Sequence, residues 1–186
     1  MKIENLRRVI VIGTSGSGKT TFARQLSALL GVKHIEIDAI NWLENWQERA
    51  PEDFKSLVEQ QITAEEWVMD GNYSRVRDVT WRRASAFVWL NYSFPVNFYR
   101  MVSRTLRRVV SREVLYSNNR ESFRQSFLSR DSIVLWMLKT YRRRRRQYAE
   151  LLRQPEWREK EIFIFARPRQ AADFLARVRE IKEKDF

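Results

Sequence analysis

The sequence contains no cysteine, a single histidine and only five glycines among its 186 residues. Without cysteine it has no disulfide framework, no thiolate metal site and no cysteine nucleophile, and His34 alone cannot form a histidine cluster. A zinc enzyme is therefore not expected. The longest apolar runs, 9–12, 86–90 and 133–138, fall far short of the roughly 20 residues of a membrane span. The first five residues also lack a signal-peptide core, so we expect a cytoplasmic protein without a membrane partner.

The composition is that of a folded domain. Hydrophobic residues make up 44% of the chain and aromatic residues 13%, including seven tryptophans. Such a chain can bury a substantial core, which disordered segments cannot do. Its length fits one domain, and we find neither an internal repeat nor a Gly/Ser-rich linker. We therefore expect a single domain over residues 1–186.

Positive charge is concentrated in one internal segment. The net charge is +12, and residues 100–147 hold 14 basic and three acidic residues, a net +11. The chain has 27 arginines and eight lysines. Arginine offers a planar fork of donors that suits phosphate. The segment is either an ordinary solvated helix face or a surface for a polyanion, namely nucleotide phosphates or nucleic acid.

Short apolar segments alternate with helical patterns along the chain. The segments with strand character are nearly continuous in apolar residues, which is typical of strands buried on both faces of a parallel sheet. They are residues 8–12, 34–37, 67–69, 86–90 and 162–165. Amphipathic patterns predict helices over 20–30, from Pro51, from Pro95, over 131–152 and over 170–181. This alternation predicts a three-layer α/β fold with a parallel sheet of about five strands.

The first strand runs directly into a phosphate-binding motif. Residues 13–20 read G-x-x-x-x-G-K-T, and an amphipathic helix follows. This order of strand, glycine loop and helix is the context the motif requires. Glycines let successive N–H groups point at phosphate oxygens, and the helix adds its positive end. The predicted nucleotide-binding residues are Gly13, Thr14, Ser15, Gly16, Ser17, Gly18, Lys19, Thr20 and Thr21. Lys19 would contact the β- and γ-phosphates, and the Thr20 hydroxyl would be a ligand of Mg²⁺.

Two aspartates follow neighbouring predicted strands. Asp38 follows the second strand and Asp70 the third, at the edge where ligands of open parallel sheets bind. Each is a candidate catalytic residue that either organises metal-bound water or accepts a proton from an attacking hydroxyl. Each is equally suited to a turn or a helix N-cap. Together with a phosphate loop, the pair favours a functional role.

Further candidates for binding the acceptor lie beside these aspartates. Gly71 predicts a sharp turn, and Arg75 is placed to meet a second phosphate or a carboxylate, unless it is a surface arginine. Aromatic residues here serve either to stack on a base or sugar or, more commonly, to pack in the core. The candidate substrate-binding residues are Asp38, Trp42, Asn72, Tyr73 and Arg75. They lie in or near residues 39–66, which we take as a helical region on the acceptor side.

The stretch from Ser111 to Arg130 differs from the rest. It is polar, weakly periodic and placed between two predicted helices. An ordinary surface loop is one interpretation, and at this length a functional lid is at least as well supported.

Several motifs resemble the nucleoside-monophosphate-kinase group of P-loop proteins. They are the glycine loop, Ile37-Asp38-Ala39, residues 67–73, Phe98-Tyr99-Arg100, and Trp136 followed by Tyr141-Arg142. The pattern is most similar to an adenylate-kinase-like branch often labelled "DNA topology modulation protein". The resemblance covers roughly residues 8–175, with a highly specific phosphate loop and moderately specific remaining motifs. That inherited label shows no activity on DNA.

The resemblance implies a sheet in the order 2-3-1-4-5, ATP on the glycine loop and an arginine-bearing lid. It implies that Asp70 organises the water around Mg²⁺. Adenylate kinases continue Asp-Gly with Phe-Pro-Arg, whereas here Phe-Pro is absent and Arg75 lies one residue later. Of two R-x-x-x-R pairs, 100/104 and 104/108, we prefer Arg100 and Arg104 as lid arginines. Arg142 corresponds to the basic residues that leave the lid.

Three functions are compatible with these observations. The favoured one is a phosphotransferase that moves the γ-phosphoryl group of Mg-ATP to a small acceptor, such as a nucleotide or nucleoside. The second is a nucleic-acid-associated NTPase that uses the basic segment as a phosphate-backbone contact, although we see no nucleic-acid-reading motif. The third is a nucleotide-binding regulator without turnover. The motif indicates nucleotide binding more strongly than it indicates chemistry.

Overall fold

A computed structural model describes residues 5–71, 73–129 and 132–184. Its centre is a five-stranded parallel sheet in the order β2-β3-β1-β4-β5, which confirms the predicted fold class and strand order. The strands are β1 (Arg8–Gly13), β2 (Lys33–Glu36), β3 (Trp67–Asp70), β4 (Ala86–Leu90) and β5 (Glu161–Phe165). β1, β3 and β4 are buried almost throughout. This explains why their sequences are continuously apolar rather than alternating.

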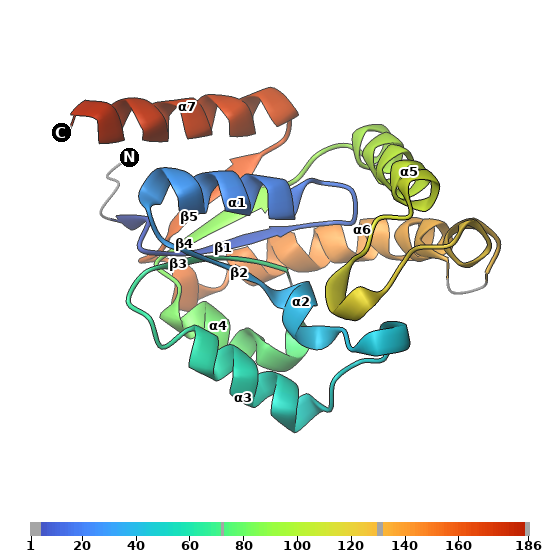
Figure 1. The fold of residues 1–186 in the computed structure, drawn as a ribbon. Coiled ribbons are helices and arrows are strands. Elements are labelled where there is room, and N and C mark those ends of the chain that lie inside the picture. Colours follow the sequence, from blue (N-terminus) through green and yellow to red (C-terminus); the bar gives the residue numbers. More distant parts are fainter. Residues whose placement is uncertain (1–4, 72, 130–131, 185–186) are drawn as a thin grey trace.

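Helices cover both faces of the sheet (Figure 1). α1 (Lys19–Leu30) and α7 (Pro168–Lys184) pack on one face through Phe22, Leu26 and Phe174. α3 (Pro51–Gln61), α4 (Arg77–Arg83) and the second half of α6 (Ile133–Leu152) pack on the other face. Successive side chains of each strand point to opposite faces of the sheet and join the hydrophobic cores on those two faces. Each central strand is therefore covered by helices on both faces. Among the described residues, no helix has both the length and the apolar character to cross a membrane.

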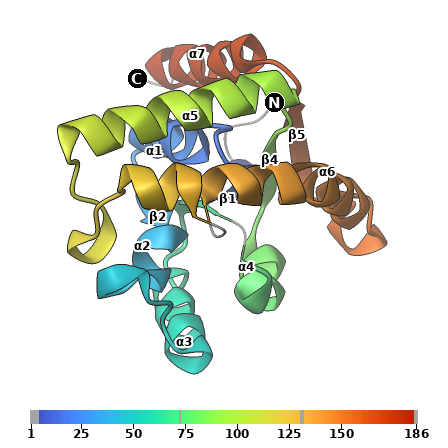
Figure 2. The ribbon, with the colours of Figure 1, turned by 90° about the vertical axis from the view of Figure 1, so that its right-hand side faces the viewer.

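α5 (Phe94–Ser111) and α6 lie across the edge of the sheet where the strands end (Figure 2). The chain between them contains a 3-10 turn at Tyr116–Asn118 and a π-helical turn at Arg124–Leu128. The predicted helices from Pro51 and Pro95 are therefore present, with Pro95 in the first turn of α5. Sequence patterning did not predict α4, which is only seven residues long.

The second strand ends earlier than its sequence predicted. β2 stops at Glu36, and residues Ile37–Asn41 form the short helix α2. Asp38 is therefore not a strand-end residue but lies in the first turn of α2. Ile37 turns into the core at this point, and its side chain fills the space in which Gly71 would otherwise carry a Cβ atom. Gly71 has φ +121°, a conformation that other residues adopt only with strain, so the tight turn after β3 requires glycine.

Candidate active site

The loop of residues 13–20 joins β1 to α1 and has the backbone of a phosphate-binding loop. Gly16 and Gly18 have φ values of +77° and +84°. Lys19 donates from Nζ to the Thr14 carbonyl at 3.3 Å, and the buried Ser17 hydroxyl has no partner among the described residues. The first turn of α1 contains no acidic residue to offset its positive end. The loop can thus donate hydrogen bonds to the oxygens of an anion from groups that the protein itself leaves free.

The start of α5 holds this loop in place. Asn97, 1% exposed, donates from Nδ2 to the Thr14 hydroxyl at 2.8 Å. A Cβ atom on Gly16 would lie only 2.1 Å from the Asn97 carbonyl oxygen, so helix and loop can meet this closely only at glycine. Arg100, one turn further on, brings Nη1 to 3.6 Å from the position of a Cβ on Gly18. α5 therefore fixes the loop and places the predicted Arg100 beside it. The role of Asn97 was not identified from the sequence.

Asp70 joins the loop to the third strand. Its Oδ2 accepts a hydrogen bond from the Thr20 hydroxyl at 2.5 Å, and its Oδ1 lies 2.8 Å from Nε2 of His34. The side chain is 1% exposed. A threonine hydroxyl beside a carboxylate is a set of hard oxygen donors that suits Mg²⁺. Thr20 and Asp70 thus lie together, and their oxygen atoms suit the predicted Mg²⁺. The contact of His34 with Asp70 was not predicted from the sequence.

Asp38 is held by a tyrosine from the next strand connection. Tyr73 donates its hydroxyl to Asp38 Oδ1 at 2.7 Å. Burial raises the pKa of Tyr73, and the charge of Asp38 raises that pKa further, so the phenol stays protonated at all physiological pH. The other carboxylate oxygen of Asp38 makes no hydrogen bond within the described residues. This leaves one oxygen fixed and one available to a ligand. Asn72, another predicted substrate-binding residue, lies outside the described residues.

Arg75, predicted to meet a second phosphate or a carboxylate of the acceptor, is engaged by neighbouring protein groups in the structure. Its Nη2 donates to Asn41 Oδ1 at 2.9 Å and to Glu48 Oε2 at 3.0 Å. Its guanidinium also stacks over the Phe54 ring, with 5.1 Å from Cζ to the ring centroid. These contacts neutralise Arg75 and tie together the elements on the acceptor side. Trp42, the remaining candidate, packs edge-on against Trp46 with 5.7 Å between ring centroids.

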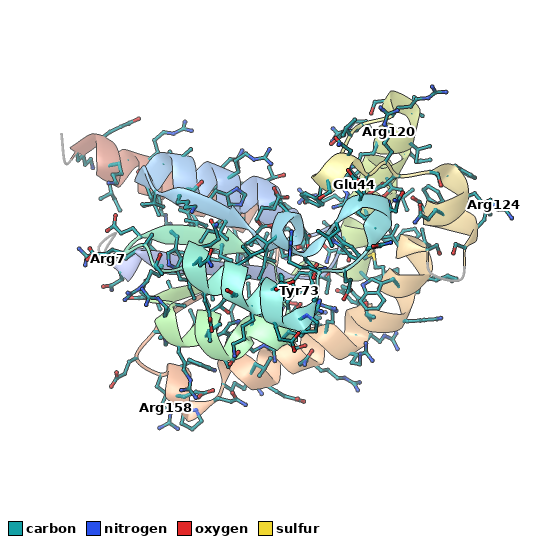
Figure 3. The ribbon with its side chains drawn as sticks, turned by 60° about the horizontal axis from the view of Figure 1, so that its bottom comes forward. Arg7, Glu44, Tyr73, Arg120, Arg124 and Arg158 are labelled. Atoms are coloured by element: carbon teal, nitrogen blue, oxygen red, sulfur yellow. The ribbon has the colours of Figure 1, made fainter. Side chains whose placement is uncertain are left out.

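Two tight turns meet over the acceptor side, one at residues 43–47 and one at 115–119. Each is closed by a backbone hydrogen bond between its end residues, 2.8 Å in the first and 2.7 Å in the second. Asn119 joins them, because its Nδ2 donates to the Leu43 carbonyl at 2.7 Å and its Oδ1 accepts from the Trp46 amide at 2.9 Å. Figure 3 shows Glu44 on the first turn and Arg120 directly after the second. The segment predicted as a lid is therefore docked on residues 43–47, and we call this contact the clasp.

A further contact reaches from the clasp to the sheet. Tyr116 donates its hydroxyl to Glu36, the last residue of β2. Burial raises the pKa of Tyr116, and the hydrogen bond to Glu36 raises it further. A protonated phenol thus links the lid segment to the strand that precedes Asp38.

Arg104 is a half-buried cation of α5. Its Nε is buried without a hydrogen-bond partner among the described residues. Burial lowers its pKa, as does the neighbouring charge of Arg108, while Glu121, Tyr116 and Asp38 act in the opposite direction. Arg108, by contrast, is paired with Glu121 at 3.2 Å and with Glu113 at 3.5 Å. The preference for Arg100 and Arg104 over the alternative pair stays a prediction. Arg142 is exposed on α6.

Comparison with solved structures supports this architecture. A shikimate kinase from Bacteroides thetaiotaomicron superposes with a TM-score of 0.56 at 16% identity, over 95% of this chain and 98% of that one. A gluconokinase from Sinorhizobium meliloti 1021 gives a TM-score of 0.51 at 21% identity, over 97% of both chains. At these identities the likeness shows the fold, which is the P-loop kinase fold. Among curated proteins, no significant match to this chain is found.

A family model adds a relationship at the level of sequence. The model described as AAA domain, AAA_18, matches residues 9–123. The match begins in β1 and spans the phosphate loop, both aspartates and the whole of α5. It covers more than half of the chain, and this chain therefore belongs to the AAA_18 family of AAA domains.

Proposed function

We propose that this protein is a small-molecule kinase that transfers the γ-phosphoryl group of Mg-ATP to a hydroxyl of its acceptor. The observation that carries the proposal is the linkage of Thr20 to Asp70 at 2.5 Å beside the phosphate loop, with Asp38 one strand away. A protein that only bound nucleotide would not need a second carboxylate, Asp38, with one oxygen available to the hydroxyl of an acceptor. The resemblance to the adenylate-kinase-like branch and the kinase fold agree with this proposal.

In this mechanism the loop amides and Lys19 bind the phosphates of ATP. Thr20 and Asp70 would hold Mg²⁺, which when bound neutralises phosphate charge. Asp38 accepts the proton of the acceptor hydroxyl through its free oxygen, while Tyr73 fixes its orientation. The acceptor oxygen forms a bond to the γ-phosphorus as the bond between that phosphorus and the departing ADP oxygen breaks. ADP and the phosphorylated acceptor are the products.

The arginines of α5 complete this arrangement. Arg100 lies beside the loop, and Arg104 is coupled electrostatically to Tyr116 of the lid segment and to Asp38. Both would stabilise the negative charge on the transferred group, with Arg142 as a third arginine when nucleotide is bound. The lid, residues 111–130, would exclude water so that phosphate reaches the acceptor rather than solvent. The clasp supports this role because it already joins the lid to the acceptor side. Arg130, the last lid residue, lies outside the described residues.

A coupled ADP-release assay tests the proposal across acceptor classes: nucleoside monophosphates, nucleosides, sugars and hydroxy acids. We expect one class to raise ADP release well above the rate with ATP alone. Nucleotide binding without stimulation by any class would instead support the regulator without turnover.

The exposed arginines of α6 favour nucleic acid as a second candidate ligand. Arg142, Arg143, Arg145 and Arg146 are all exposed on this helix. If they contact a nucleic-acid backbone, the affinity for duplex DNA should fall with salt at a log–log slope of about −0.9 per phosphate contact. A slope near zero would reject this candidate.

Replacing Asp70 by asparagine is expected to lower turnover about 10- to 100-fold, as with other residues that orient metal ligands. The amide keeps the shape of the side chain, but its nitrogen cannot accept from Thr20 or bind a cation. ATP affinity, measured by calorimetry, should change only a few-fold, because the loop and Lys19 remain. Asp78→Asn is the control, since Asp78 is exposed and pairs with Lys55. Unchanged turnover at saturating Mg²⁺ would make Asp70 a purely structural residue.

Replacing Asp38 by asparagine is expected to reduce acceptor-dependent turnover about 100-fold, the scale of general-base catalysis. The slow release of ADP without acceptor should stay the same, because Asp38 faces the acceptor and not the metal. Measuring ADP release with and without acceptor on one preparation distinguishes a role of Asp38 toward the acceptor from a role toward the metal. Asp53→Asn, at an exposed position in α3, serves as control. Equal losses in the two rates would place Asp38 on the metal instead.

A further inference from the structure

The only histidine of the chain lies beside the residues that suit Mg²⁺. His34 is the second residue of β2, and parallel pairing sets it opposite Val68 of β3, two residues before Asp70. Paired residues, and residues two positions apart on a strand, point to the same face of a sheet. His34 and Asp70 therefore meet on the face that α1 covers (Figure 1), where Nε2 of His34 lies 2.8 Å from Oδ1 of Asp70.

The two oxygens of Asp70 have different partners. Oδ2 accepts a hydrogen bond from the Thr20 hydroxyl at 2.5 Å, whereas Oδ1 is the oxygen that faces His34. A carboxylate can only accept hydrogen bonds, so Nε2 of His34 carries the hydrogen and donates it to Oδ1. The carboxylate is thus held at both oxygens, by α1 on one side and by β2 on the other.

The orientation of Asp70 depends on His34 because little else can bind Oδ1. The Asp70 side chain is 1% exposed and that of His34 is 16% exposed, so water has little access to this oxygen. Within the described residues, no lysine or arginine forms an ion pair with Asp70. A buried oxygen without a partner is costly, and one hydrogen bond from Thr20 would leave the carboxylate free to turn. The imidazole therefore decides which oxygen stays beside Thr20.

We propose that His34 is a positioning residue for Mg²⁺, which binds Oδ1 of Asp70 and thereby keeps Oδ2 beside the Thr20 hydroxyl. This inference rests on the proposed kinase function and deepens its metal site. Mg²⁺ prefers oxygen ligands, so the imidazole acts through Asp70 and not as a ligand itself. Residues that orient a metal ligand in this way change metal affinity or activity about 10- to 100-fold when they are lost.

The effect of Mg²⁺ on nucleotide binding tests this role without turnover. Calorimetry measures the affinity for a non-hydrolysable ATP analogue over a range of Mg²⁺ concentrations. His34→Leu removes the donor and should need about 10- to 100-fold more Mg²⁺ than the wild type for the same gain in affinity, while the metal-free affinity stays unchanged. His34→Gln keeps an N–H donor and should recover part of the effect. Lys33→Ala, at the exposed neighbouring position of β2, should behave as the wild type.

Two further outcomes of this experiment separate the possible roles. If His34 only stabilised the fold, His34→Leu would lower the melting temperature and leave the Mg²⁺ requirement unchanged, and that result would overturn the proposal even if an acceptor supports turnover. If no acceptor supports turnover but His34→Leu still raises the Mg²⁺ requirement, the kinase function fails and the role of His34 stands.

Nuclear magnetic resonance of the imidazole supplies a readout that needs no variant of His34. The chain has one histidine, so a protein prepared without a histidine tag gives a single set of imidazole ¹⁵N signals. We expect these signals to show the hydrogen on Nε2 and to shift when Mg²⁺ is added to the protein with the ATP analogue bound. In Asp70→Asn, the response to Mg²⁺ should disappear. A hydrogen on Nδ1 alone, or wild-type signals that do not respond to Mg²⁺, would overturn the proposal.

Discussion

The Lys19→Ala variant is expected to lose about 10³-fold in turnover, and its affinity for ATP should fall below detection by calorimetry. Lys19 is the charge that the motif provides for the β- and γ-phosphates, and within the described residues its Nζ makes a hydrogen bond only to the Thr14 carbonyl, at 3.3 Å. A preorganised charge at a phosphoryl group contributes most in the transition state, on the order of 10²- to 10³-fold per donor or more.

The fold should survive this change. Lys19 lies at the first position of α1, is not part of the core and forms no ion pair within the described residues. We therefore expect its melting temperature to stay within about 4 °C of wild type, a shift that corresponds to roughly 1 kcal/mol or less. Lys33→Ala, at the exposed start of β2, is the matched control. Equal ATP affinities for Lys19→Ala and the wild type would remove the assignment of this loop as the nucleotide site.

The elements that the sequence predicted well are those with continuous or strongly periodic apolar patterns. Residues 86–90 and 67–69 have the pattern of strands buried on both faces, and the structure places them in β4 and β3, inside the sheet. The phosphate loop was predicted because its glycine spacing reflects a local backbone requirement that needs no tertiary information. The segment 77–83 was missed because seven residues are too few for a clear helical period.

The site residues that sequence analysis missed are those whose role arises only from tertiary contacts. His34 matters because parallel pairing sets β2 beside β3, which brings its ring to Asp70 at 2.8 Å. Asn97 matters because α5 folds back onto Gly16. The same limit explains Arg75: its sequence position beside the turn was identified, but the pairing with Glu48 that neutralises it depends on how residues 42–49 fold.

Removing the Arg104 guanidinium should separate activity from stability. Arg104→Ala is expected to lower turnover about 10³-fold, the lower range for an arginine that stabilises phosphoryl transfer. Its melting temperature should not fall by more than about 4 °C, about 1 kcal/mol. The reason is that Arg104 is a cation whose pKa burial lowers and whose Nε has no partner among the described residues, so its charge opposes folding. If Arg104 served only the structure, its loss would lower the melting temperature and leave turnover unchanged.

Three variants of α5 make this test specific. Arg107→Ala, exposed on the same helix, should leave both turnover and melting temperature unchanged. Arg108→Ala should destabilise the lid segment, because it breaks the ion pairs to Glu113 and Glu121. Arg104→Lys should recover only part of the rate, since a point charge lacks the planar fork of donors.

The position of Arg104 explains why its effect depends on the lid. The charges of Tyr116 in the lid segment and of Asp38 in α2 both raise the pKa of Arg104, so its guanidinium is coupled electrostatically to both sides. Asn119 holds the two sides together through Leu43 and Trp46. If the guanidinium acts on the transferred phosphoryl group, Arg104→Ala should lower kcat and leave KM for ATP nearly unchanged. Wild-type kcat in Arg104→Ala would instead exclude a role of this half-buried cation in the reaction, because the charge that builds up in the transition state would then be stabilised without it.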